Sequence, residues 1–244
     1  LGDKFSGTLL VASKPGSFYE QEWFYVEVYY KIDATAGEVM VRINTQTVVS
    51  LVSANTVPVG ATGSYFDSYF IGADGVHSNP AANIEAYWDD FYFNSSAGTE
   101  NNTFFGNVKV KAQLTFAAGD VTTWSRVGAA ANYLAANNPA IDDTKYVYSP
   151  TTGDYDLYAM DPSLNTPIVH AIQTRIAARQ DDATQRILHA MIKTGGVEFE
   201  GTIDHYLNQS YTYYMDIWEL NPDTGVGWTG AEVNALQVGP KVDT

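Results

Sequence analysis

The residues best suited to chemistry are three carboxylates in the aromatic stretch "NIEAYWDDFYF": Glu85, Asp89 and Asp90. Two carboxylates about 5–9.5 Å apart can hydrolyse a glycosidic bond. On an extended strand Glu85 and Asp89 point the same way, but four residues at about 3.3 Å each separate them by roughly 13 Å. This spacing argues against a catalytic pair, and no catalytic residue is assigned.

Asp89 and Asp90 could instead bind Ca²⁺ together with a nearby carbonyl oxygen, since Ca²⁺ prefers oxygen ligands. More often, adjacent carboxylates of this kind accept hydrogen bonds from loop amides. We therefore expect loop binding here, and we assign no metal ligand, no cofactor and no binding residue.

The histidines His77, His170, His189 and His205 are scattered along the chain. His170 and His189 lie on strands that are predicted to pair, so they could be neighbours and hold a metal ion. Two histidines on neighbouring strands more often lie close together by chance than to bind a metal ion. A Ser–His–Asp triad needs no sequence adjacency, but nothing points to one. The P-loop, G-x-S-x-G, H-E-x-x-H and EF-hand patterns do not occur, and we expect a non-enzymatic protein.

Aromatic residues beside the carboxylates offer a second kind of site. The rings of Trp88 and Tyr92 could stack on sugar rings, because aromatic faces present a large apolar area with a polar tip. Such rings more often fill a core or a domain contact. Exposure of Trp88 or Tyr92 would favour sugar or partner binding.

Composition restricts the partners. The chain has 244 residues, a net charge of −15 and no cysteine. An acidic protein repels phosphate backbones, so a nucleic-acid partner is not expected. The lack of cysteine excludes disulfides and thiolate metal sites. No run of 18 apolar residues occurs, so membrane insertion is not expected either.

The elements that would position these residues are mostly strands, because apolar residues alternate with period two. A turn at 34–37 is predicted to join two strands as a hairpin, and 178–186 is predicted to be another hairpin loop. The segment 119–143 is predicted to be a loop with one or two helical turns near 129–138. Strands are predicted at 22–33, 38–51, 64–73, 83–94, 107–116, 144–149, 153–160, 168–179, 185–196 and 211–220.

The closing stretch "NPDTGVGWTGAEVNALQVGPKV" predicts a short helix of about two turns. Thr229 and Glu232 have the spacing of a capping box, and Gly and Pro at 239–240 are predicted to end the helix. Trp228 is expected to be buried where the turn meets the second sandwich. The apolar stripe of the helix consists of Val233 and Leu236.

The polar, turn-rich segment 94–103 divides the chain. The prediction is an all-β protein with two tandem β-sandwich domains, 1–104 and 105–244, and a short C-terminal helix.

Several motifs in order carry a family resemblance: "VMVRIN", then "DDFY", "FGNVKV" and "DDTKYVYSPTTGDYDLY", and the closing stretch quoted above. From residue 22 to 242 the chain resembles tailed-bacteriophage virion structural proteins with a concanavalin A-like (laminin-G-like) jelly-roll domain. Under this resemblance the first half of such a domain is missing before Leu1, so 1–104 would be the C-terminal part of a longer domain.

The resemblance implies a virion protein, tail-associated or decorating the head, that packs against other virion proteins and against copies of itself as a homo-oligomer. It implies no catalytic residues. One alternative is a lectin-like module that binds a host surface glycan. A glycan-cleaving enzyme is the remaining, less favoured alternative.

Overall fold

A computed structural model describes residues 10–14, 16, 22–57 and 87–244. Strands make up 40% of these residues and helices 5%, in several antiparallel sheets with two short helices. The predicted all-β class is confirmed. The chain forms two compact units, Leu1–Val110 and Lys111–Thr244, whereas the sequence placed the boundary after residue 104.

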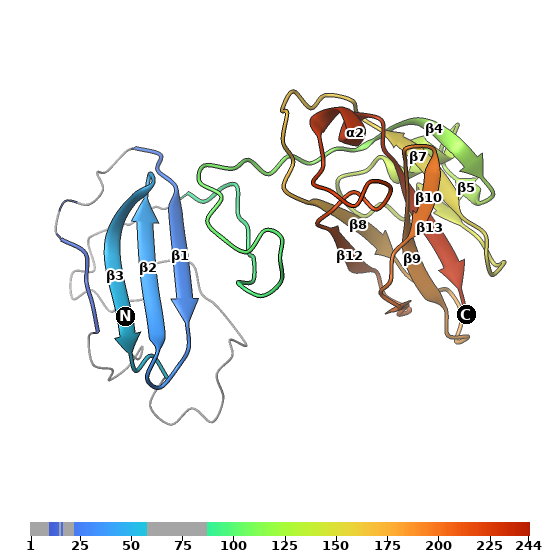
Figure 1. Ribbon diagram of the computed structural model, residues 1–244. Coiled ribbons are helices and arrows are strands. Elements are labelled where there is room, and N and C mark those ends of the chain that lie inside the picture. Colours follow the sequence, from blue (N-terminus) through green and yellow to red (C-terminus); the bar gives the residue numbers. More distant parts are fainter. Residues whose placement is uncertain (1–9, 15, 17–21, 58–86) are drawn as a thin grey trace, which may run out of the picture. The chain divides into compact units, whose positions relative to one another are not determined.

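The first unit contains a three-stranded antiparallel sheet of β1 (Val26–Lys31), β2 (Gly37–Ile43) and β3 (Gln46–Ala54), in the order β1-β2-β3 (Figure 1). The predicted hairpin is confirmed, with β1 and β2 paired from Val26↔Ile43 to Lys31↔Glu38.

Side-chain hydrogen bonds explain the first reversal of the chain in this sheet, and backbone conformation explains the second. In the first, Asp33 Oδ1 accepts the backbone N–H groups of Thr35 and Ala36 at 2.8 and 2.7 Å. In the second, Asn44 and Thr45 have φ values of 48° and 72°. Left-handed residues at both positions match the right-handed twist of the flanking strands. The sequence prediction missed this second turn, since Asn-Thr lacks the usual glycine.

The buried residue of β1 is a carboxylate, Glu27. Glu27 is 4% exposed, while Val28 is 60% exposed. Oε1 of Glu27 accepts the Tyr92 hydroxyl at 2.8 Å and the backbone N–H of Gly106 at 2.7 Å. A buried carboxylate is costly unless it is hydrogen-bonded, and these two donors supply the bonds.

Two predicted strands around the unit boundary are wrong. Residues 87–93 form no strand, and Asp90 has φ 52°. Of the predicted strand 107–116, only Thr115 and Phe116 belong to a strand. The carboxylate of Asp90 accepts the N–H of Val110, so this amide bonds to a side chain rather than to a neighbouring strand. The predicted strand 64–73 lies outside the described residues.

The second unit is built around a six-stranded sheet with the order β10-β9-β13-β7-β4, in which β11 also pairs with β9 (Figure 1). All its pairings are antiparallel. Its strands are β4 (Thr115–Thr122), β7 (Asp156–Met160), β9 (Ile187–Thr194), β10 (Val197–Glu200), β11 (His205–Tyr206) and β13 (Gln237–Asp243).

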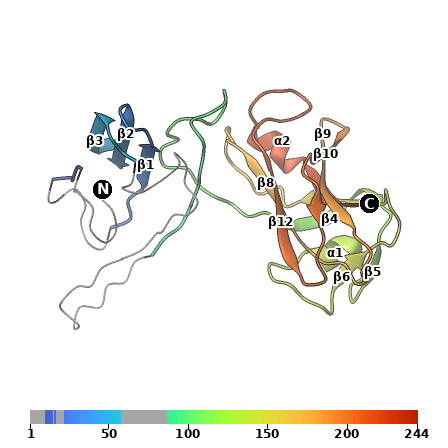
Figure 2. The same cartoon turned by 90° about the horizontal axis from the view of Figure 1, so that it is seen from below.

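Two smaller sheets complete this unit. β8 (Ile172–Ala178) pairs with β12 (Thr212–Trp218), and β5 (Ser125–Val127) pairs with β6 (Tyr146–Tyr148). Helix α1 (Asn132–Ala136) lies beside β5 and β6 (Figure 2), within the segment that was predicted to contain helical turns. Each helix spans five residues, far too few to cross a bilayer, so no membrane-crossing helix occurs in the described part of the chain.

The core of the second unit lies between its sheets and α2 (Gly230–Asn234). Its buried members are Ile192, Trp228, Val233 and Leu236. Ile172 and Trp218 from the smaller sheet and Phe199 and Val238 from the larger sheet pack against them. The predicted burial of Trp228 and of the helix stripe is confirmed, with Trp228 2% exposed.

The predicted capping box is also confirmed. The backbone N–H of Glu232 donates to Thr229 Oγ1 at 3.3 Å, and the backbone N–H of Thr229 donates to Glu232 Oε2 at 2.7 Å. The bonds that the Thr229 N–H and then the Thr229 hydroxyl donate to the carboxylate hold the pKa of Glu232 below its ordinary value. The helix is shorter than the predicted two turns.

Gly239 and Pro240 do not end the helix, which was a wrong prediction. They lie inside β13. A side chain on Gly239 would collide with the Asp156 carbonyl oxygen. β13 pairs with β7 at Gln237 and Val238, and an isolated bridge then joins Lys241 to Tyr155. Pro240 lies between these two pairings, at a position where no paired N–H is needed.

The predicted hairpin at 178–186 is wrong as well. β8 pairs with β12, and β9 pairs with β10, β11 and β13. The two strands beside this loop thus belong to different sheets. Alternation fixes which face of a strand is apolar, but it does not name the partner strand.

Candidate functional site

The Asp90 carboxylate binds residues of the following loop. Its Oδ1 accepts the backbone N–H of Val110 at 2.8 Å, and its Oδ2 lies 2.6 Å from Lys109 Nζ. These contacts, the Lys109 bond first, hold the pKa of the Asp90 carboxyl below its ordinary value. Asp89 Oδ1 accepts the N–H of Asp90 at 2.8 Å. Both carboxylates thus have the loop role that the sequence favoured, and Glu85 lies outside the described residues.

The neighbouring aromatic side chains divide between surface and interior. Trp88 is 62% exposed, and Phe91 and Phe93 are exposed with ring centroids 4.9 Å apart. Tyr92 is half-buried and donates to Glu27. Burial, followed by this hydrogen bond, raises the pKa of Tyr92 to about 12. Trp88 is therefore placed to stack on a ligand, and Tyr92 is not.

Strand pairing does not make His170 and His189 neighbours, although the sequence predicted that their strands pair. His170 precedes β8 and His189 lies on β9, strands that do not pair with each other. His205, on β11, places Nε2 2.9 Å from Asp216 Oδ2 on β12. This bond links two strands of different sheets. His77 lies outside the described residues.

Charged side chains cover the outer face of the six-stranded sheet, opposite the apolar core. Lys193 Nζ lies 2.7 Å from Asp120 Oδ2 and 3.6 Å from Glu198 Oε1. The Tyr155 hydroxyl donates to Glu198 Oε2 at 2.7 Å. Lys193 lowers the pKa of the Asp120 carboxyl, and Glu198 raises the pKa of the Tyr155 hydroxyl. One lysine thus joins three strands, β4, β9 and β10.

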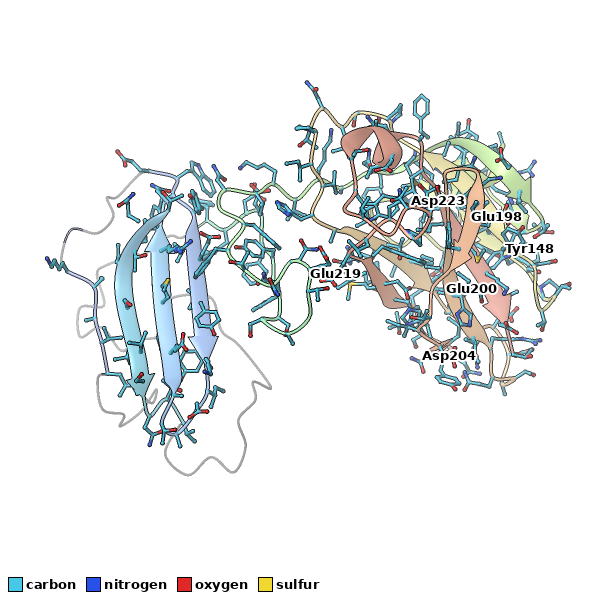
Figure 3. All side chains as sticks on the ribbon, in the orientation of Figure 1. Tyr148, Glu198, Glu200, Asp204, Glu219 and Asp223 are labelled. Atoms are coloured by element: carbon cyan, nitrogen blue, oxygen red, sulfur yellow. The ribbon has the colours of Figure 1, made fainter. Side chains whose placement is uncertain are left out.

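A second charged group on this face contains a buried histidine. We call it the His189 cluster, and its members are His189 on β9, Glu200 on β10, Asp204, and Lys241 and Asp243 on β13. One ligand atom each from His189, Glu200 and Asp243 lie within 4.8 Å of one another. Figure 3 shows Glu198, Glu200 and Asp204 following one another along β10 and the chain after it.

Contacts within the His189 cluster are close. His189 Nδ1 lies 3.0 Å from the Gly201 carbonyl oxygen and 3.6 Å from Glu200 Oε1, and Nε2 lies 3.5 Å from Asp204 Oδ1. Lys241 Nζ lies 2.5 Å from Glu200 Oε2 and 3.9 Å from Asp243 Oδ2. His189 is 8% exposed. No sequence motif indicated this cluster, since its residues come together only through the pairing of distant strands.

The β8–β12 sheet presents an apolar outer face, which we call the β12 face. Tyr213, Met215 and Ile217 alternate along β12 and are 40%, 48% and 68% exposed. On the paired strand, Arg175 stacks 3.7 Å above the Tyr213 ring. Asp216, the carboxylate of β12, is buried instead.

A small pocket of about 130 Å³ lies in the second unit among β4, β5, α1 and β7. The polar groups beside the pocket are hydrogen-bonded to one another in a buried network. Asp156 Oδ2 accepts from Asn132 Nδ2 at 2.6 Å and from the Tyr158 hydroxyl at 2.7 Å. Its Oδ1 accepts the backbone N–H groups of Thr123 and Trp124. Burial, followed by the charge of Asp156, raises the pKa of Tyr158. The network fixes the loop after β4.

Comparisons with models of protein families, with curated proteins and with solved structures found no match. Inferences about function therefore rest on this chain's own residues and on the resemblance described above.

Proposed function

We propose that the chain is a non-enzymatic structural protein of a bacteriophage virion, tail-associated or decorating the head, built from tandem jelly-roll sandwiches. It acts by packing against copies of itself and against other virion proteins. The all-β architecture and the order of motifs that resembles such proteins support the proposal. The observation that carries it is the β12 face.

The β12 face has the properties of a contact surface. Contiguous exposed apolar side chains on a sheet mark interaction sites in many proteins. Tyr and Met, both present here, are enriched in interfaces, as is Arg, and Arg175 lies beside them. The three side chains alternate along one strand, so a flat partner could cover all of them at once.

On this face, charge does not oppose a second copy of the chain as the partner. The chain carries a net charge of −15, so most pairs of surfaces from two copies repel each other. The carboxylate of β12, Asp216, is buried and bonded to His205. Two β12 faces can therefore approach without bringing these carboxylates together.

Sedimentation velocity of the full chain tests the self-association. We expect a concentration-dependent oligomer that is lost in Ile217→Lys and kept in Ile168→Lys, a control with similar exposure, 65% against 68%. A monomer at all concentrations, or equal loss in both variants, would contradict the assignment of this face. Peptides of the chain in purified phage particles, measured by mass spectrometry, test the virion location.

Exposed Trp88 supports a second candidate, a lectin-like function that recognises a host glycan. An exposed indole can stack on a sugar ring. Glycan-array binding by the wild type that disappears in Trp88→Ala, but persists in a control Trp23→Ala, would favour this candidate. Trp23 is 75% exposed, so both substitutions remove a surface indole.

A further inference from the structure

We propose that His189, Glu200 and Asp243 bind a divalent transition-metal ion on the outer face of the six-stranded sheet. Three adjacent strands supply the ligands: β9 carries His189, β10 carries Glu200 and β13 carries Asp243. Ligands on paired strands are held more firmly than ligands on loops. This site does not depend on the proposed virion function.

The spacing of the ligand atoms suits such an ion. With metal–ligand distances of about 2.1 Å, two ligand atoms on a tetrahedral site lie about 3.4 Å apart. His189 Nδ1 and Glu200 Oε1 are 3.6 Å apart. The third ligand atom, from Asp243, lies within 4.8 Å of the other two, so a modest side-chain movement completes the site.

The surroundings of His189 allow either ring nitrogen to carry the proton. When Nδ1 is protonated, it donates to the Gly201 carbonyl oxygen at 3.0 Å. When Nε2 is protonated instead, it faces Asp204 Oδ1 at 3.5 Å. In the second form Nδ1 carries a lone pair, 3.6 Å from Glu200 Oε1 and 3.0 Å from the Gly201 carbonyl oxygen. A carboxylate behind the second ring nitrogen is the usual support of a metal-bound histidine. Asp204 is thus a positioning residue.

Lys241 already holds a positive charge at this place. Its ammonium group lies between the carboxylates of Glu200 and Asp243, at 2.5 and 3.9 Å. Asp204, beside His189, adds a third carboxylate to the cluster, which holds one ammonium group and therefore keeps an excess of negative charge. A divalent ion would neutralise more of that charge than Lys241 does, and would have to displace it. Lys241 therefore competes with a metal ion for the carboxylates of Glu200 and Asp243.

The donor set indicates the class of ion. An imidazole nitrogen with two carboxylate oxygens suits Zn²⁺, Co²⁺ or Mn²⁺, whereas Ca²⁺ binds oxygen ligands. About a third of each carboxylate side chain, 34% for Glu200 and 38% for Asp243, is exposed. The ion can therefore enter from solvent without opening the core.

Titration of the full, metal-stripped chain with Zn²⁺ and with Co²⁺ tests the proposal. Calorimetry measures Zn²⁺ affinity, and the visible absorption of Co²⁺ reports on its ligands. We expect one site, lost in His189→Gln and in Asp243→Asn, and kept in the control His170→Gln. Asp204→Asn should weaken binding about 10–100-fold, as removal of a supporting carboxylate does. Lys241→Met should strengthen binding.

The variants also separate metal binding from folding. Melting without metal shows whether each variant folds, and only folded variants are compared. Lys241→Met should melt at a lower temperature than the wild type without metal and recover with Zn²⁺. Zn²⁺ affinity unchanged in His189→Gln, or no Co²⁺ absorption in either the wild type or Lys241→Met, would overturn the proposal. Binding of Ca²⁺ alone, unchanged in His189→Gln, would also overturn it.

Discussion

The two units differ in what is buried beneath their sheets. In the described part of the first unit, Val39 is the buried hydrophobic residue, and Glu27 and Thr56 are buried polar residues. In the second unit, a continuous cluster around Trp228 joins two sheets and a helix. Among the described residues, hydrogen bonds to buried polar groups are the main contacts of the first sheet, and apolar packing is the main contact of the second. Hydrogen bonds fix geometry but contribute modest net stability, whereas buried area contributes more.

Removing Trp228 should produce the largest effect, because this side chain belongs to the buried apolar cluster of the second unit. Trp228→Ala should lower the free energy of unfolding of the second unit by about 3–5 kcal/mol. The exposed Trp23 provides the matched control. Denaturant unfolding followed by circular dichroism measures both variants. A Trp228→Ala protein as stable as the Trp23→Ala protein would show that the cluster does not hold the second unit together.

Removing the Glu27 carboxylate should have a smaller effect. It tests how much the buried hydrogen bonds stabilise the first unit. Glu27→Ala leaves the Tyr92 hydroxyl and the Gly106 N–H without their acceptor, which should cost about 1–3 kcal/mol. Glu38→Ala, at a more exposed carboxylate of the same sheet, should change stability little. Equal melting curves for the two variants would show that the buried carboxylate is dispensable.

The Thr229 cap should contribute less again. Thr229→Ala removes the acceptor of the Glu232 N–H and should cost about 0.5–2 kcal/mol. The exposed Thr224, in the preceding turn, serves as the control position for Thr→Ala. Thermal unfolding of both variants measures the difference. If Thr224→Ala lost as much stability as Thr229→Ala, the capping box would not be the cause.

The smallest effect is expected from alkaline pH acting on Tyr92. Its pKa is raised to about 12 from an ordinary value of 10.0, so folding favours the protonated phenol. The associated stability is complete below about pH 10 and is lost as pH rises towards 12. Tyr92→Phe removes this titration, so its stability should fall less than that of the wild type over this range. Because the chain has 17 tyrosines, the difference in tyrosinate absorbance between the wild type and Tyr92→Phe follows this group.

Local signals in the sequence predicted local structure well. The spacing of Thr229 and Glu232 specifies a capping box within four residues, and the alternation in β1 and β2 specifies a hairpin across a short turn. Neither depends on distant partners, and the structure confirms both.

Features set by distant pairing could not be predicted in this way. The sequence beside β8 looks like one arm of a hairpin, but β12, more than thirty residues further on, is its partner. Pro240 looked like a helix terminator, because the local sequence does not show that it lies between two pairings of β13 with the chain at β7. The His189 cluster combines β9, β10 and β13. Its one local hint was the alternation of Glu198 with Glu200 and of Lys241 with Asp243, which puts each pair on one face.

The central place of β13 has a consequence for how the second unit folds during synthesis. β13 is the strand that joins β9 to β7, yet the ribosome makes it after all the others in this sheet. Until residues 237–243 emerge, β4 with β7 and β9 with β10 form separate pieces, each with an open edge that could pair with another chain. Joining them requires contacts between distant residues, which form slowly. The nascent chain should therefore be most prone to aggregate just before β13 is released.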